Sequence, residues 1–485
     1  MKNQVHLITY VDCLTQGGMK KLQLLLDKEL KDVFGGVHLL PFFYPIDGTD
    51  AGFDPIDHTQ VDSRLGSWED INSLSQTTDI MADVIVNHVS AQSPQFLDYL
   101  EHGEKSSYAE MFLTLDTVFP NGVSEKELLA VYRPRPSLPF TTISLKDGSK
   151  KMFWTTFTSN QIDIDVQCDQ GKAYLISILD KFNKSGIKMI RLDAAGYAIK
   201  KAGTSCFMIP ETFDFINWFR EKATAYGMEV LVEIHSYYKK QIEIAKQVDW
   251  VYDFALPPLV LHSIFTRTSE YLKKWIEIRP QNTITVLDTH DGIGVMDVGG
   301  AKGLPGLLPE EDIDSLVEQM HLNSKGQSKA ATGAAASNLD LYQVNCTYID
   351  ALGKNEDHYL MSRAIQFFLP GVPQVYYSGL FAEPNDMELL AKTNVGRDIN
   401  RHYYSDDELV NALGRPVVQK LIKLIKFRNS HPAFNGNFTL EPSNSESLKL
   451  SWKNGGNWNK LDINYTNMSF QISYNEEDQE HFLNL

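Results

Sequence analysis

The chain has 485 residues, of which 43% are hydrophobic and 11% aromatic, so it can bury a large core and carry appended domains. Its formal net charge of −17 argues against a general nucleic-acid binder and against a protein that binds anionic membranes. The four cysteines form no paired motif, the N-terminus lacks the pattern of a signal peptide, and no apolar run is long enough to span a bilayer. We therefore expect a soluble, cytoplasmic protein.

Short apolar runs alternate with helix-like segments along most of the chain. The first helical patterns cover residues 19–34 and 68–78, and later ones begin near residues 171, 210 and 359. Such alternation is typical of a parallel sheet with right-handed crossovers. The apolar runs predict eight strands, at residues 5–10, 36–43, 80–88, 186–193, 229–235, 250–255, 283–291 and 371–377. Eight strand–helix units predict a closed (β/α)8 TIM barrel.

Two long excursions interrupt the alternation, and the C-terminal segment has a different pattern. Residues 89–165 are rich in Tyr, Phe and Pro, and residues 292–355 contain a stretch rich in Gly and Ala. We expect the first to form an inserted domain B after strand 3 and the second an insertion after strand 7. From residue 433 to 485, short polar–apolar alternation predicts a small antiparallel β domain. The barrel itself is then expected to comprise residues 1–88, 166–291 and 356–432.

The apolar run that ends at Asp193 carries the most informative single residue. Asp193 falls where a buried strand leaves its sheet, which in α/β barrels is the rim that holds catalytic groups. Arg191 lies two residues earlier, on the same side of the strand, and should keep the carboxylate ionised. An ionised carboxylate at a barrel mouth is a candidate nucleophile, although the same residue could merely cap the next helix.

Other acidic and histidine residues recur at the predicted strand ends. They are Glu233 and Asp291, together with His88 and His290. Glu233 lies among apolar residues of its strand, so burial should raise its pKa and favour the protonated acid. Two carboxyl groups with different proton affinities are what retaining glycoside cleavage needs, at a separation of about 5–5.5 Å.

Four segments resemble the signature regions of glycoside hydrolase family 13, the α-amylase family. They are Asp83–His88, Arg191–Asp193, Glu233 and Thr289–Asp291. Longer stretches are similar to the branch of that family whose bacterial members split sucrose with inorganic phosphate. These stretches are residues 132–136, 202–208, 233–238, 252–258, 334–343 and 396–404, and the similarity extends from the first strand to about residue 429.

The resemblance implies a retaining double displacement. Asp193 would be the nucleophile, Glu233 the general acid/base, and Asp291 the carboxylate that stabilises the transition state. The substrates and products would be sucrose, inorganic phosphate, α-D-glucose 1-phosphate and fructose, with transfer of glucose to other acceptors as well. Neither a cofactor nor a metal ion is implied.

The resemblance also implies a set of substrate-binding residues. Phe53 and Phe157 would clamp the sugar ring, and an acidic protein needs a movable cation such as Arg135 to accept phosphate. Arg135 and the segment 340–343 match acceptor-side loops that rearrange in the family. The full set is Asp50, Phe53, His88, Arg135, Phe157, Gln161, Arg191, Tyr197, His235, His290, Asp340, Leu341, Tyr342, Gln343 and Arg397.

Several alternatives stay open from the sequence. Asn87 matches a calcium-binding position of many α-amylases, although no acidic cluster suited to calcium accompanies it. The same machinery could act on sucrose 6'-phosphate, glucosylglycerol or glucosylglycerate. A non-catalytic barrel that serves as a scaffold is a further alternative, against which all three acidic residues are present. A homodimer is suggested by the resemblance alone.

Overall fold

The computed structural model describes residues 1–485 except 49–50, 136, 302, 334–342 and 478. Eight parallel strands form a closed barrel in the order β1–β16–β13–β12–β11–β10–β5–β2, so strands that follow one another along the chain are neighbours. Their bounds are β1 His6–Thr9, β2 Gly36–Leu39, β5 Asp79–Ile85, β10 Met189–Asp193, β11 Glu229–Val232, β12 Trp250–Asp253, β13 Thr283–Thr285 and β16 Val372–Tyr376. The predicted (β/α)8 barrel is confirmed.

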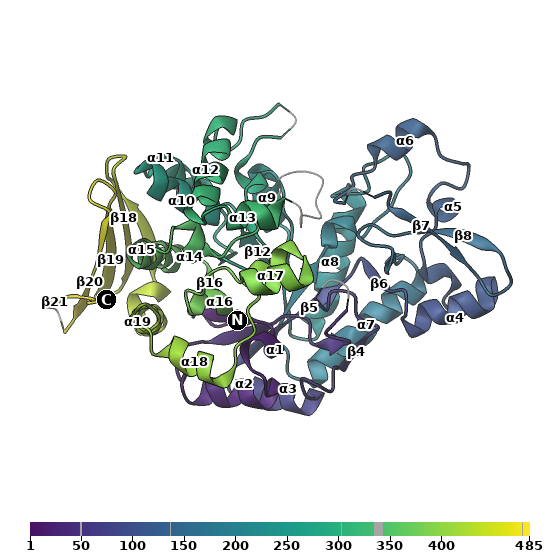
Figure 1. The fold of residues 1–485 in the computed structure, drawn as a ribbon, viewed down its shortest axis with the longest axis horizontal. Coiled ribbons are helices and arrows are strands. Elements are labelled where there is room, and N and C mark those ends of the chain that lie inside the picture. The colour runs from purple at the N-terminus through teal and green to yellow at the C-terminus, as the bar shows by residue number, and fades with distance from the viewer. Residues whose placement is uncertain (49–50, 136, 302, 334–342, 478) are drawn as a thin grey trace.

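Amphipathic helices surround the barrel (Figure 1). Helix α7 buries Leu175, Ile178, Leu179 and Phe182, the spacing of one helical face. The helix expected over residues 19–34 is shorter, because it ends at Asp27 and is followed by turns in which Asp32 has a φ of 62°. The main helices are α2 Gly18–Asp27, α3 Trp68–Ser75, α7 Asp169–Lys184, α8 Pro210–Ala225, α9 Tyr238–Ala245, α10 Leu256–Thr266, α11 Glu270–Ile278, α15 Glu356–Phe368, α18 Asp406–Leu413 and α19 Pro416–Ser430.

The segment after β5 projects away from the barrel, on the right of Figure 1. It contains two antiparallel strand pairs, β6 (His88–Ser90) with β9 (Gln161–Asp163) and β7 (Phe140–Ser144) with β8 (Lys150–Trp154). Helices α4 (Pro94–His102), α5 (Leu115–Val118) and α6 (Glu125–Ala130) complete it. Because β6 begins at the end of β5, this projection starts directly at the barrel mouth.

The segment after β13 returns to the same mouth. Strand β14 (Ile293–Gly294) pairs with β15 (Gln343–Val344), and the short helix η4 (Met296–Val298) follows β14. Helices α12 (Glu310–Asn323) and α13 (Gln327–Thr332) lie between the two strands in sequence. Both inserted segments therefore begin just after the carboxyl ends of barrel strands, β5 and β13.

The C-terminal residues form a five-stranded antiparallel sheet, as expected. Its strands are β17 Asn437–Glu441, β18 Ser447–Asn454, β19 Asn457–Asn464, β20 Ser469–Glu476 and β21 Gln479–Phe482. The indole Nε1 of Trp452 donates to the carbonyl of Phe368 at 2.7 Å, which joins the sheet to α15. The division of the chain into a barrel, two insertions and this sheet at the boundaries given above remains our proposal.

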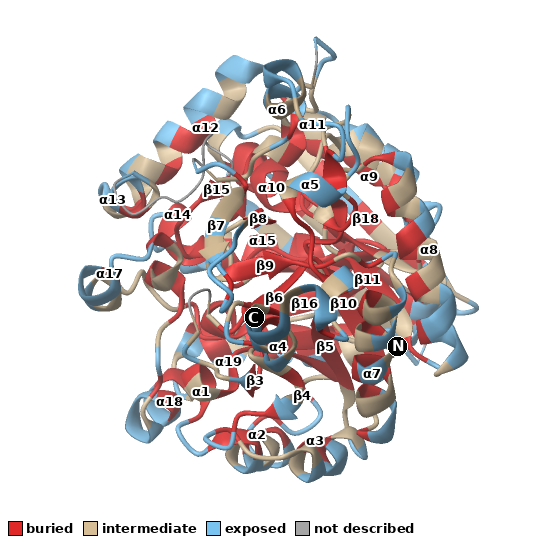
Figure 2. Cartoon of the chain, turned by 90° about the vertical axis from the view of Figure 1, so that its right-hand side faces the viewer, coloured by how far each residue is buried: buried red, intermediate tan, exposed pale blue. Residues whose placement is uncertain are grey.

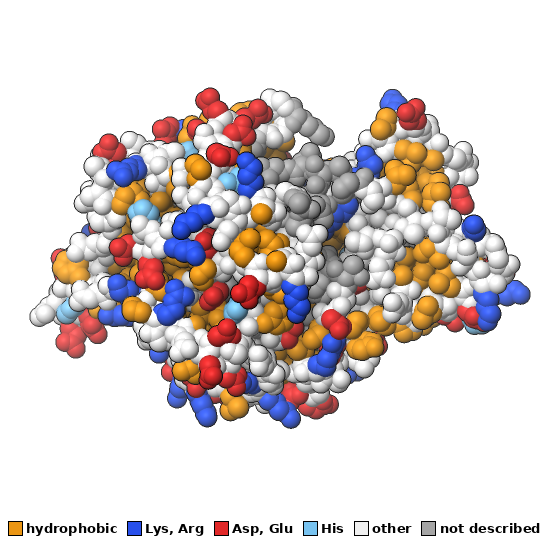
Figure 3. Space-filling view, in the orientation of Figure 1, with side chains coloured by type: hydrophobic (Ala, Val, Ile, Leu, Met, Phe, Trp, Pro, Cys, Tyr) orange, Lys and Arg blue, Asp and Glu red, His pale blue; other side chains and the backbone are white. Residues whose placement is uncertain are grey.

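Burial follows this architecture. The barrel strands and the inner faces of the helices are buried, while the outer helical faces are exposed (Figure 2). On the face drawn in Figure 3, acidic and basic side chains are interspersed over the surface. None of the helices in the described part of the chain is long and apolar enough to cross a membrane.

Candidate active site

Asp193 and Glu233 leave adjacent strands at equivalent positions. The register pairs Leu192 of β10 with Val232 of β11, and the backbone nitrogen of Glu233 donates to the carbonyl of Leu192 at 3.2 Å. Asp193 ends β10 and Glu233 directly follows β11. Parallel strands in this register deliver both carboxyl groups to the carboxyl end of the barrel.

One guanidinium group contacts both of these carboxyl groups. Arg191 Nη1 donates to Asp193 Oδ1 at 3.0 Å, and Arg191 Nη2 lies 3.9 Å from Glu233 Oε1. The backbone nitrogen of Ala194 donates to Glu233 Oε2 at 3.4 Å. Burial alone would lower the pKa of Arg191, but Asp83, Asp193 and Glu233 raise it well above its usual value. Arg191 therefore stays positively charged and keeps the carboxyl groups of Asp193 and Glu233 close to each other.

Asp83 anchors this arginine from within the barrel. Its side chain is fully buried, and Asp83 Oδ1 accepts from Arg191 Nη1 at 2.5 Å. Burial alone would raise the pKa of Asp83, but His38 and Arg191 lower it to about 2. Asp83 thus stays ionised and acts as the structural partner of Arg191.

The surroundings of Glu233 differ from those expected from its sequence neighbours. Its carboxyl group faces Arg191 and also lies 3.6 Å from His235 Nε2. The apolar side chains of Leu231 and Val232 are packed into the core. The predicted partly apolar environment was incomplete. The sequence of a strand does not show which side chains of neighbouring segments lie beside its last residue, here Arg191 and His235.

Asp291 is held beside two further basic side chains. Arg397 Nη1 lies 2.8 Å from Asp291 Oδ1, and His290 Nε2 lies 3.7 Å from the same oxygen. Burial would raise the pKa of Asp291, but Arg397, then His290 and Arg191, hold it far below its usual range. Burial lowers the pKa of His290 to about 3, so the imidazole is neutral at working pH. Asp291 is consequently an ionised carboxylate beside a neutral hydrogen-bonding ring.

Aromatic rings and histidines line the expected glucose side. The ring of Phe53 stacks on His290 with centroids 5.1 Å apart, and its backbone carbonyl lies 2.9 Å from His88 Nε2. Phe157 meets His88 edge-on at 5.6 Å and Tyr197 at 5.1 Å. The structure therefore brings Phe53, His88, Phe157, Tyr197 and His290 together around the acidic residues. Asp50 lies outside the described residues.

Gln161 has an incompletely satisfied amide. Its side chain is buried on β9, and its Oε1 accepts from the Thr158 hydroxyl at 3.1 Å. Among the described residues, its Nε2 has no hydrogen-bond acceptor. Buried amide donors are normally paired, and a sugar hydroxyl would supply the missing acceptor.

Tyr197 and Gln343 link further predicted substrate-binding residues to the site. The pKa of Tyr197 is raised well above its usual value by burial, to which Tyr132 and Glu233 add, while the charge of Arg135 opposes the rise. Tyr197 is thus close enough to sense both the expected acid/base and Arg135. Gln343 Oε1 accepts from Arg397 Nη2 at 3.3 Å, which joins that loop to the glucose side. Asp340, Leu341 and Tyr342 lie outside the described residues.

A lysine occupies the surroundings of Asn87, the residue that raised the question of calcium. Lys200 Nζ donates to Asn87 Oδ1 at 2.7 Å, lies 2.7 Å from Asp163 Oδ2, and also bonds the carbonyl of Tyr197. The side chains of Lys200 and Asp163 are 1% and 0% exposed. An amide, a carboxylate and a carbonyl oxygen thus converge on an ammonium group, in a place where such oxygens could otherwise bind a hard cation. That no metal is required remains a prediction.

Substitution of this lysine should destabilise the fold. Lys200→Met leaves the buried carboxylate of Asp163 without its cation, and we expect the free energy of unfolding to fall by about 3–5 kcal/mol. The neighbouring Lys201→Met is the matched control, because Lys201 is 56% exposed and pairs with Glu211 at the surface. Denaturant unfolding of the two variants measures the difference. A Lys200→Met variant as stable as the control would contradict a structural role for this ion pair.

In the part of the chain that the structure describes, one group of His, Asp and Glu side chains has the spacing of a metal site. It consists of Glu233, His235 and Asp291, whose polar atoms lie within 4.8 Å of one another. All three lie at the expected reacting centre, and we assign no metal to them.

Comparison with known proteins agrees with this geometry. Residues 16–278 match the family model described as "Alpha amylase, catalytic domain". The chain is 60% identical over 467 residues to a sucrose phosphorylase of Agrobacterium vitis, with 96% of each chain covered. It is 56% identical over 456 residues to a sucrose phosphorylase of Bifidobacterium adolescentis, with 93% of this chain and 90% of the relative covered. The crystal structure of sucrose 6F-phosphate phosphorylase from Thermoanaerobacter thermosaccharolyticum superposes with a TM-score of 0.93 at 39% identity, covering 100% of this chain and 98% of that one.

The fold and the comparisons together define a carbohydrate-active (β/α)8 enzyme with its acidic residues at the mouth of the barrel. The chain belongs to the α-amylase family.

Proposed function

We propose that this chain is a sucrose phosphorylase, which converts sucrose and inorganic phosphate reversibly into α-D-glucose 1-phosphate and fructose. The proposal rests on one observation: Asp193 and Glu233 lie at the ends of neighbouring strands, and both carboxyl groups face the guanidinium group of Arg191. The two sucrose phosphorylases that are 60% and 56% identical over more than nine-tenths of this chain support the choice of substrate.

In the first step, a glucosyl group is transferred to the enzyme. A carboxylate oxygen of Asp193 attacks the anomeric carbon of glucose as the bond to the fructosyl oxygen breaks. Glu233 gives its proton to that oxygen, and fructose leaves. Asp291, ionised beside Arg397, stabilises the positive charge that develops on the sugar ring. The product is a β-glucosyl ester on Asp193.

In the second step, phosphate replaces fructose. A phosphate oxygen attacks the anomeric carbon from the side that fructose has left, while the carboxylate of Glu233 accepts any proton that this oxygen carries. The ester bond breaks and the carboxylate of Asp193 is restored. Two inversions give α-D-glucose 1-phosphate, so the configuration at the anomeric carbon is retained.

Incubation of the protein with sucrose and phosphate, followed by assay of glucose 1-phosphate and free glucose, tests this proposal. We expect glucose 1-phosphate to be the main product and the kinetics to be ping-pong. Sucrose 6'-phosphate is the second candidate substrate, favoured by the crystal structure of a 6F-phosphate enzyme at a TM-score of 0.93. The same assay with sucrose 6'-phosphate, glucosylglycerol and glucosylglycerate separates these substrates.

Arg135 provides a prediction about the second step alone. Arg135→Ala should raise KM for phosphate by about 10-fold or more, because one charged hydrogen-bonding group is lost from the anion site. Cleavage of sucrose, measured by release of fructose while a neutral acceptor takes the glucosyl group, should change much less. Arg133→Ala, two residues away in the same loop, is the control. An unchanged dependence of rate on phosphate in Arg135→Ala would show that Arg135 does not bind this anion.

A further inference from the structure

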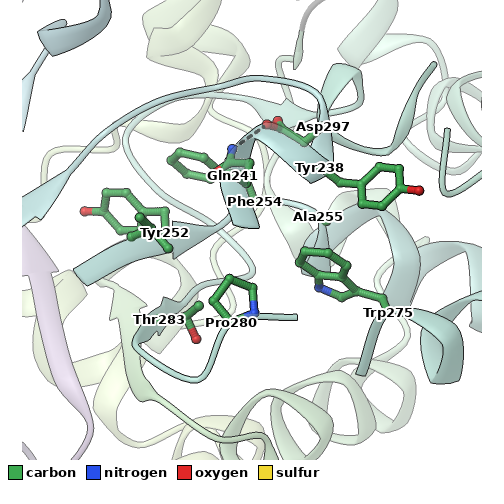
Figure 4. Close-up of a pocket in the computed structure, with 10 residues that line it drawn as sticks. Tyr238, Gln241, Tyr252, Phe254, Ala255, Trp275, Pro280, Thr283 and Asp297 are labelled. Carbon is green, nitrogen blue, oxygen red and sulfur yellow. Dashed lines mark hydrogen bonds between the residues drawn. The ribbon is translucent and has the colours of Figure 1, made fainter. Parts of the chain in front are cut away.

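A carboxylate that the sequence did not single out lies behind the expected acid/base. Asp297 is on η4 and is 1% exposed. Its Oδ2 lies 2.9 Å from His235 Nδ1, and its Oδ1 accepts from the backbone nitrogen of Ser236 and from Gln241 Nε2, each at 3.1 Å. The bond from Gln241 is drawn in Figure 4. Donors from the residues that follow β11 and from α9 thus fix the orientation of this carboxylate.

The imidazole of His235 is also held on its faces. It stacks on the ring of Phe254, with centroids 3.9 Å apart and planes 12° from parallel. A Cβ atom on Gly294 would approach Asp297 Oδ2 to 2.9 Å and His235 Nδ1 to 3.6 Å, so this glycine lets β14 pack against the pair. Held in this way, the ring places Nε2 at 3.6 Å from Glu233 Oε1.

The carboxylate determines which nitrogen of His235 carries a proton. Because Nδ1 faces Asp297, Nδ1 is protonated, and Nε2 is the nitrogen directed at Glu233. Burial would lower the pKa of His235, but Asp297, followed by Glu233 and Asp291, raises it above its usual value. In the part of the chain that the structure describes, these three carboxylates raise the pKa of the ring. The cationic form of His235 is consequently favoured.

A small cavity lies beside Asp297. The cavity drawn in Figure 4, lined by Tyr252, Trp275 and Asp297 among others, has a volume of about 10 Å³. A space of that size reaches only the lower bound for one water molecule. In such surroundings, the charge of Asp297 acts on His235 with little screening.

We propose that Asp297 is a positioning residue for the phosphate step, because it holds His235 as a cation with Nε2 beside Glu233, where the phosphate anion arrives. This inference rests on the proposed function. The chain has a net charge of −17, and three carboxylates surround the anomeric carbon, so an incoming anion is repelled unless local cations receive it. His235 supplies such a cation next to the base, and the charge of Asp297 favours this cationic form.

Asp297→Asn tests the proposal, because asparagine keeps the shape of aspartate and removes its charge. We expect kcat/KM for phosphate to fall about 10- to 100-fold, with less than about threefold change in kcat/KM for sucrose. Since the carboxylate raises the pKa of His235, its loss should move the alkaline limb of the phosphate-dependent rate to lower pH, by about one unit. Asp312→Asn, at a second carboxylate beside a buried histidine, His262, is the control and should change neither constant.

A double-mutant cycle shows whether Asp297 acts through His235. His235→Gln alone should reproduce the loss for phosphate, and Asp297→Asn should add little in that background. His235→Gln leaves Asp297 bonded to Ser236 and Gln241, so it still tests the inference if Asp297→Asn fails to fold. Equal losses for sucrose and phosphate, an unmoved alkaline limb, or additive effects of the two substitutions would overturn the proposal.

The wild-type chain separates the two possible failures. If it forms no glucose 1-phosphate from any of the four glucosides, the proposed function is wrong. If it forms glucose 1-phosphate but the variants show no selective loss for phosphate, only the role of Asp297 is wrong.

Discussion

Asp193→Asn should reduce turnover of sucrose by about 10,000-fold or more, because the amide cannot attack the anomeric carbon. The fold should survive, since Arg191 keeps its buried partner Asp83 and asparagine has the shape of the residue that it replaces. Initial rates of fructose release with wild-type and variant protein measure the loss. Thermal unfolding of both shows whether the loss is chemical.

A second observation tests the covalent intermediate itself. Wild-type protein quenched during turnover should carry one glucosyl unit on the peptide that contains Asp193, detected by mass spectrometry, and the variant should carry none. The control is Asp165→Asn, which removes the same negative charge outside the site. Asp83→Asn is unsuitable because it disturbs Arg191. Normal turnover by Asp193→Asn would remove the nucleophile assignment and with it the proposed mechanism.

The barrel could be predicted because its strands are almost entirely buried. Strand β16 is buried at every position, and it appears in the sequence as a mostly apolar run, with Gln374 its one amide side chain, after a helical pattern. Asp193 and Glu233 were recognisable because a charged residue at the end of such a run marks the rim of the barrel. The end of α2 could not be located, because the change to turns near Asp32 depends on local backbone geometry.

Residues that act through other residues left no signal in the sequence. Asp297 and Lys200 meet their partners across 62 and 37 positions of chain, in contacts that only the folded barrel makes. Arg401 is a further example, since its buried guanidinium donates to the carbonyl of His290 at 3.2 and 3.1 Å. The spacing of such residues has no period, so no strand or helix pattern identifies them.

The arrangement of charge explains why the site needs these hidden residues. Asp193, Glu233 and Asp291 share a small space, and their mutual repulsion is offset by Arg191 and Arg397. Buried Asp83 holds Arg191, and buried Gln343 accepts from Arg397. The glucose side is thus balanced by fixed arginines. On the acceptor side, we infer that His235 and Arg135 provide the positive charge. That side alone must bind a neutral sugar, fructose, in one step and an anion, phosphate, in the other.

Glu233→Gln should slow the cleavage of sucrose by about 100- to 10,000-fold, the range that a general acid contributes. The defect should depend on the leaving group, because glutamine cannot protonate the fructosyl oxygen but leaves Asp193 and Arg191 in place. With α-glucosyl fluoride, whose leaving group needs no proton, the first step should proceed at close to the wild-type rate. The control is Glu243→Gln, which makes the same chemical change at the surface of α9. An equally large loss with sucrose and with the fluoride would mean that Glu233 shapes the site and does not transfer the proton.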